Sequence, residues 1–297
     1  MTTPGILRGA FRETYRNIPL VTTLYGMNLL FASVIAMAFR AFVAHPGNAG
    51  ALGPLLKDFD MTLLYDFLRT RGEAISALWQ VVLFMTLLSV ALNAVSSGGV
   101  LATLESGAPY SLRAFLGGCG TFAFRFLRLL VLTGIVTGLA AIALVACAMP
   151  VLWWLSRNHT SEIPVIEGIA AAALALVLVL FLAVMASDYA RVLTVRADSR
   201  SMARAFGTSF VFLAKNAWGA IALQVIVALL TVCLFALYLG LTGLLEMNSG
   251  PKVVLVFIVQ QVFVWCRSFL RVMLFSCELA FTRSRVSGSG TTEIVST

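Results

Sequence analysis

The stretch from Ile169 to Tyr189 reads IAAAALALVLVLFLAVMASDY and carries no charged side chain before Asp188. About 20 consecutive apolar residues are enough for a helix to cross the hydrocarbon core of a bilayer, so the stretch predicts a membrane-spanning helix. The chain as a whole is 60% hydrophobic and 11% charged, against roughly a half and roughly a quarter in soluble domains. These figures exclude a water-soluble globular protein and predict an all-α integral membrane protein.

Six apolar runs have spanning length. The spans are expected at residues 18–44, 74–95, 126–155, 169–189, 217–245 and 253–274. The first run exceeds the roughly 7–15 apolar residues of a signal peptide, which predicts a retained helix. We expect an N-terminal interfacial helix at residues 1–17, a six-span domain at 18–284 and a disordered tail at 285–297. Inside the six-span domain, an outer amphipathic helix is expected at about 48–73.

The orientation follows from the Lys and Arg residues beside the spans, which gather on the cytoplasmic side of bacterial membranes. Of the 21 Lys and Arg residues, fifteen lie on the side of both termini: Arg8, Arg12, Arg16, Arg113, Arg125, Arg128, Arg191, Arg196, Arg200, Arg204, Lys215, Arg267, Arg271, Arg283 and Arg285. We therefore predict cytoplasmic N- and C-termini. The excess of positive charge, a formal +8 over the whole chain, is therefore expected on the cytoplasmic side, where anionic lipid headgroups attract it.

Amphipathic stretches precede the odd-numbered spans. In Ser201–Asn216 and Tyr110–Phe126 the apolar residues recur at helical spacing, with basic residues off that stripe. The two stretches also resemble each other, because Arg113-Ala-Phe115 matches Arg204-Ala-Phe206. We predict interfacial helices on the cytoplasmic surface and three parallel copies of one unit, consisting of an interfacial helix, a span, an outer turn and a span.

The sixth span carries an intramembrane polar stripe. Gln260, Arg267, Arg271 and Glu278 are 7, 4 and 7 residues apart, which places them along one side of a helix. Asp188 and Glu278 are candidate partners for the buried arginines. One interpretation is a polar pocket that holds an anionic lipid headgroup or a substrate. The other is an arginine that snorkels to the interface or pairs with Asp188 as structural support.

Two further interpretations concern contacts with lipids and between helices. The hypothetical lipid or anion contacts are Arg267, Arg271, Arg204, Lys215 and Arg113. In the third span, Gly134 and Gly138 form a GxxxG motif, which predicts close helix packing.

Signatures of catalysis are missing from the sequence. His45 and His159 belong to no metal-binding motif. Asp58-Phe-Asp60 begins like a calcium loop, but Leu63 replaces the glycine that the loop requires. The five cysteines form no short-spaced pair. We therefore assign no catalytic residue, cofactor or metal ligand and expect no enzymatic activity and no nucleic-acid partner.

One family resemblance concerns the chain from the fourth span to the fifth. Ala190-Arg-Val-Leu193 leaves the membrane, Arg204-Ala-Phe206 opens an interfacial helix, and Lys215-Asn216 ends it. Over residues 74–285 this order resembles bacterial six-helix membrane proteins that include the membrane domain of some glycerophosphodiester phosphodiesterases. The resemblance implies a helical bundle in the bacterial inner membrane that is associated with lipids. The hydrolytic chemistry of those enzymes belongs to a soluble domain that is absent here.

Two functional hypotheses follow. The first is a non-enzymatic inner-membrane protein that acts as a lipid-associated scaffold or as a subunit of a larger complex. The alternative is a transporter or lipid-translocating protein with a polar cavity lined by the sixth span. Membrane lipids with anionic cytoplasmic headgroups, and other membrane subunits, are the expected partners.

The predicted orientation can be tested with reporter fusions. We expect alkaline phosphatase, which is active only outside the cytoplasm, to be active when fused after Asn158 and inactive when fused after Ala108, because these residues flank the third span on opposite sides. The reverse pattern of activity would contradict the orientation, and equal activity at both points would contradict the third span.

Overall fold

The computed structural model describes residues 3–45, 61–158, 161–198, 201–245 and 249–288. The fold is all-α. Its helices are α1 (Thr3–Arg16), α2 (Ile18–Ala44), α4 (Met61–Thr70), α5 (Gly72–Ser106), α6 (Leu112–Asn158), α7 (Ile163–Ala197), α8 (Met202–Leu244) and α9 (Gly250–Gly288). Among the described residues, six helices are long and apolar enough to cross a membrane: α2, α5, α6, α7, α8 and α9. The prediction of six apolar helices long enough to span a membrane is therefore confirmed.

Parts of the expected organisation fall outside the described residues. Of the outer amphipathic helix expected over residues 48–73, the structure describes α4 and the start of α5, and residues 46–60 lie outside it. Of the tail expected over residues 285–297, residues 289–297 lie outside it as well. The sixth span continues as helix to Gly288, beyond the expected end of the six-span domain.

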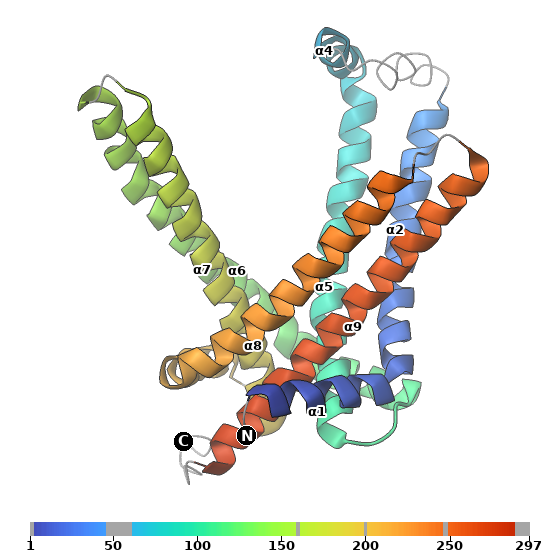
Figure 1. The fold of residues 1–297 in the computed structure, drawn as a ribbon, viewed down its shortest axis with the longest axis vertical. Coiled ribbons are helices and arrows are strands. Elements are labelled where there is room, and N and C mark those ends of the chain that lie inside the picture. Colours follow the sequence, from blue (N-terminus) through green and yellow to red (C-terminus); the bar gives the residue numbers. More distant parts are fainter. Residues whose placement is uncertain (1–2, 46–60, 159–160, 199–200, 246–248, 289–297) are drawn as a thin grey trace. The chain divides into compact units, whose positions relative to one another are not determined.

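The chain forms two compact units. Unit 1 comprises residues 1–21 and 94–297, and unit 2 comprises residues 22–93. In unit 1, α6 packs along α7, α8 along α9, and α7 along α8, while α1 packs on α9. Figure 1 shows α1 crossing α9, with the N-terminus near the C-terminal end of α9. In unit 2, Ala38, Ala41 and Ala77 line a groove of about 340 Å³ between α2 and α5.

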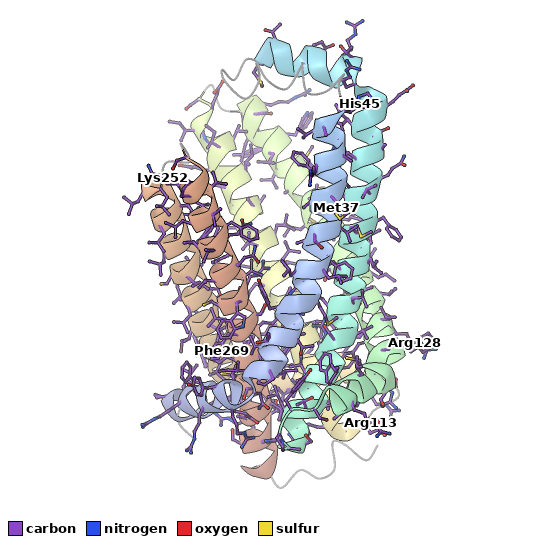
Figure 2. The ribbon with its side chains drawn as sticks, turned by 90° about the vertical axis from the view of Figure 1, so that its right-hand side faces the viewer. Met37, His45, Arg113, Arg128, Lys252 and Phe269 are labelled. Carbon is purple, nitrogen blue, oxygen red and sulfur yellow. The ribbon has the colours of Figure 1, made fainter. Side chains whose placement is uncertain are left out.

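The buried core of unit 1 lies at one end of its long helices. The buried residues come from the last turns of α5, α7 and α9 and from the first turns of α6 and α8, together with α1. Six arginines of this end are Arg16, Arg125, Arg191, Arg196, Arg271 and Arg283, and we call it the basic end. Figure 2 shows Arg113 and Arg128 at this end and Lys252 at the opposite end. Beyond the core, the long helices expose large apolar side chains, as bilayer-facing helices do.

Two interfacial helices end at an asparagine. The chain turns at Asn17 between α1 and α2, and Asn216 has non-helical dihedral angles inside α8. Each asparagine donates its side-chain amide to the carbonyl four residues before it, on Glu13 at 3.0 Å and on Phe212 at 3.1 Å. Asn93 makes the same bond to the Ser89 carbonyl inside the continuous helix α5, so the bond accompanies the two breaks and does not cause them by itself.

The second predicted interfacial helix differs from the other two. Residues 112–126 are continuous with the third span in the 47-residue helix α6. The position that corresponds to Asn216, 91 residues earlier, is Arg125. Its guanidinium pairs with Asp198 and cannot make the bond that the asparagine makes. The expected boundary near Phe126 is therefore not a helix end.

The predicted threefold repeat agrees with hydrogen bonds at the ends of the even-numbered spans. Thr103 in α5, Thr194 in α7 and Thr282 in α9 are buried. Each donates its hydroxyl to the carbonyl four residues before it, at 2.7 Å in all three helices. Thr121, Thr231 and Thr242 make the same kind of bond elsewhere, so the threefold repeat stays a prediction. The serines before two interfacial helices also correspond, because Ser111 and Ser201 accept from the amide three residues later.

The closest helix packing joins α5 to α6 and does not involve the predicted GxxxG motif. A β-carbon at Gly99 would lie 2.6 Å from the Phe115 carbonyl oxygen and from Cys119 Sγ. At Gly134 and Gly138, in contrast, a β-carbon would meet nothing within 4 Å. The GxxxG prediction of close contact in the third span is therefore wrong. Close packing occurs instead at the glycines of α5 that face the first turns of α6.

Gly99→Ala tests this contact. We expect the free energy of unfolding in mild detergent to fall by about 1–3 kcal/mol, because the added methyl overpacks against a carbonyl that cannot rotate away. Gly117→Ala is the matched control, since a β-carbon there meets nothing within 4 Å. It should leave stability unchanged or raise it by up to about 1 kcal/mol. Equal effects of the two substitutions would contradict the packing.

Candidate functional site

The structure brings together part of the predicted polar stripe. Asp188 of α7 and Glu278 of α9 are buried, with 8% and 1% of their surface exposed. Arg271 is half-buried and interacts electrostatically with Asp188. Gln260 and Arg267 are exposed. Asp188, Arg271 and Glu278 therefore gather in the core of the basic end, while the other two residues of the stripe lie at the surface.

Asp188 is the best-paired carboxylate of this group. Its Oδ1 accepts a hydrogen bond from Arg191 Nη1 at 3.0 Å, and both side chains are nearly buried. The two residues are three apart in α7, a spacing at which helical side chains meet. Arg271 adds a second positive charge from α9. The ion pair therefore lies where α7 packs against α9, and it supports the structural interpretation of the stripe.

Glu278 has a different environment. Neither carboxylate oxygen has a hydrogen-bond partner within the described ranges of the chain. The charge of Asp188 repels the Glu278 carboxylate, and the charge of Arg191 attracts it. The hydroxyl of Tyr189 and the Nε of Arg191 are also buried without a partner there. Buried polar atoms without hydrogen bonds are uncommon in folded proteins, so these four atoms form the most unusual chemical feature of the core.

A second ionic contact joins the ends of three helices. Glu105, at the end of α5, accepts from Arg283 of α9 at 2.8 Å and lies 3.9 Å from Arg196 of α7. Arg283 also donates to the Glu105 backbone carbonyl at 3.2 Å. These groups are partly exposed, so each pair contributes little free energy of folding by itself. Their geometry nevertheless fixes which helix ends are neighbours.

The predicted lipid contacts divide into two groups. Arg113, Arg204 and Lys215 are exposed in the interfacial segments of α6 and α8, where a headgroup could reach them. Arg271 instead faces Asp188. Arg267 lies two residues before Phe269, whose ring centroid is 5.5 Å from that of Phe11 in α1. If α1 lies in the membrane interface as predicted, Arg267 is close to headgroup depth.

Sequence reasoning missed Arg191 and Glu105. For Arg191 we predicted a basic residue beside a span and no ion pair. Its three-residue separation from Asp188 is nevertheless a spacing at which helical side chains pair. The pairing of Glu105 with Arg196 and Arg283 joins residues 91 and 178 positions apart, and no local pattern reveals it. Within the described residues, no three His, Cys, Asp or Glu side chains are arranged to hold a metal ion.

Comparisons with known proteins return no relatives. No protein-family model matches the chain, and no curated protein or solved structure shows significant similarity to it. The resemblance to the six-helix family therefore stays a prediction.

The two buried carboxylates should respond differently to neutralisation. We expect Asp188→Asn to lower the free energy of unfolding by about 3 kcal/mol, because it leaves Arg191 and Arg271 close together without their counter-charge. Reversible unfolding in mild detergent measures this loss.

Glu278→Gln is the matched control, since it removes a carboxylate of similar burial that makes no hydrogen bond among the described residues. We expect a change within about 1 kcal/mol, the size of a typical hydrogen-bond contribution. A loss as large as that of Asp188→Asn would show that Glu278 has a partner and would contradict the assignment of the ion pair as the stabilising contact.

Proposed function

We propose that the protein is a non-enzymatic scaffold, or a subunit of a larger complex, in the bacterial inner membrane. Its termini lie in the cytoplasm, and its basic end contacts anionic lipid headgroups. The observation that carries the proposal is the division of unit 1 into a packed basic end and long helical arms whose large apolar side chains are exposed. A packed base that holds apolar arms in the membrane suits a protein whose role is to bind other membrane proteins.

The charged groups of the core support a structural role. The Asp188–Arg191 pair lies within α7, where Arg271 of α9 also acts on Asp188, and Glu105 lies between Arg196 and Arg283. An enzyme would keep its reactive groups beside a space that a substrate can enter, whereas these charged side chains pair with one another in and around the packed core. The buried polar atoms of Glu278 and Tyr189 are compatible with a structural role, since they lie in the same packed core.

The lipid association rests on the exposed basic residues of the interfacial segments. Arg113, Arg204 and Lys215 are exposed beside apolar residues that are buried, such as Phe115 and Phe206. This arrangement places positive charge over the membrane surface, where each Lys or Arg contributes about 1 kcal/mol of attraction to anionic lipid.

Photo-crosslinking along α6 tests the scaffold. A photoreactive amino acid at Leu139 or Ile142, which are exposed and three residues apart on one side of the helix, should give the same discrete protein adduct in intact cells. The same probe at Val192, which is buried in α7, should give none. Adducts with lipid alone at both exposed positions would contradict the scaffold and leave the membrane placement intact.

A further inference from the structure

An apolar groove lies in unit 1 between α1, α8 and α9, and the proposed function leaves it unused. Its volume is about 420 Å³. Its walls include Phe11 and Tyr15 of α1, Leu230 and Leu234 of α8, and Trp265 and Phe269 of α9. The aromatic side is held in place by ring contacts, because Phe269 meets Phe11 edge-on at 5.5 Å and stacks on Trp265 at 6.0 Å.

The size of the groove favours a narrow occupant. A helix with its side chains is about 10–12 Å across with a pitch of 5.4 Å, so one turn fills roughly 400–600 Å³. An open groove of this size would contact only a short part of a helix that crosses the membrane. A hydrocarbon chain is much thinner, and it is the apolar material that surrounds these helices in a bilayer.

The charge beside the groove favours an anionic lipid. On α1, Arg8 is three residues before Phe11 and Arg12 three before Tyr15, so the arginines occupy the adjoining surface of the same helix. Both arginines are exposed, and neither has an ion-pair partner within the described part of the chain. Glu13, the acid of α1, accepts from Ser276 of α9 at 2.6 Å on the side of the helix that packs on α9.

We propose that this groove binds an acyl chain of an anionic glycerophospholipid, with the phosphate beside Arg8 and Arg12. The lipid belongs to the leaflet at the basic end, because α1 marks the interface there. The chain would lie against Trp265 and Phe269 and fill the space between α8 and α9. The proposal rests on the membrane placement given under the proposed function.

Tryptophan quenching tests the site directly, since Trp265 lines it. A variant that keeps only Trp265 replaces the other four tryptophans, each exposed, by Phe: Trp79, Trp153, Trp154 and Trp218. In vesicles, brominated phosphatidylglycerol should bind beside Trp265 more tightly than brominated phosphatidylcholine, by about fivefold or more, since one basic residue contributes about a fivefold preference for anionic lipid. Native mass spectrometry of the unaltered protein should likewise retain bound phosphatidylglycerol.

Matched variants separate the groove from general surface charge. Arg8→Gln with Arg12→Gln should abolish the anionic preference at Trp265, whereas Arg128→Gln with Arg285→Gln should preserve it, because the second pair is exposed, does not line the groove and neutralises as much charge. Leu234→Phe should reduce quenching by both lipids by filling the groove. Leu237→Phe, on an exposed part of α8 outside the groove lining, should not.

A variant that keeps only Trp218, which is 89% exposed in α8, distinguishes failure of the groove from failure of the membrane placement. Quenching at Trp218 without quenching at Trp265 would mean that protein covers the groove, and would overturn the lipid site alone. Equal quenching of Trp265 by the two lipids would also overturn it. No quenching at either tryptophan would overturn the membrane placement as well.

Discussion

Apolar side chains gain little by leaving lipid hydrocarbon for one another, and the structure of unit 1 follows from this constraint. In water a helix buries its apolar face because water excludes it, but inside a bilayer the lipid is as apolar as the neighbouring helix. The arms of α6, α7, α8 and α9 accordingly expose their leucines and valines. Dense packing occurs at the basic end, which we propose to lie at the headgroups, where polar bonds and hydrophobic burial both contribute to folding.

The contacts of the basic end are chemically diverse. A glycine permits close approach at Gly99, an ion pair within α7 joins Asp188 to Arg191, and aromatic rings meet around Tyr189 and Phe281. Each type has a defined geometry, so together they select one arrangement of the helices. Apolar contact alone would leave their rotation about their own axes weakly determined.

The sequence predicts the spans well because span length and hydropathy are properties of continuous segments. It predicts Asp188 and Glu278 as notable for a similar reason, since charge is rare in an apolar run. The GxxxG of Gly134 and Gly138 misleads because the motif does not specify which helix faces it, and in the structure no side chain approaches either glycine closely. The bridging role of Glu105 lies beyond prediction from local pattern, because its partners are distant in the chain.

The position four residues before each buried threonine is Gly99 in α5, Ala190 in α7 and Glu278 in α9. In the threefold repeat that we predict, a homotrimer of identical two-span proteins would have to carry the same side chain at all three places. Joining the predicted units in one polypeptide removes that restriction, because each copy can change by itself. A fused chain can thus carry a glutamate in one predicted copy only, as at Glu278, whereas a symmetric assembly of identical chains cannot.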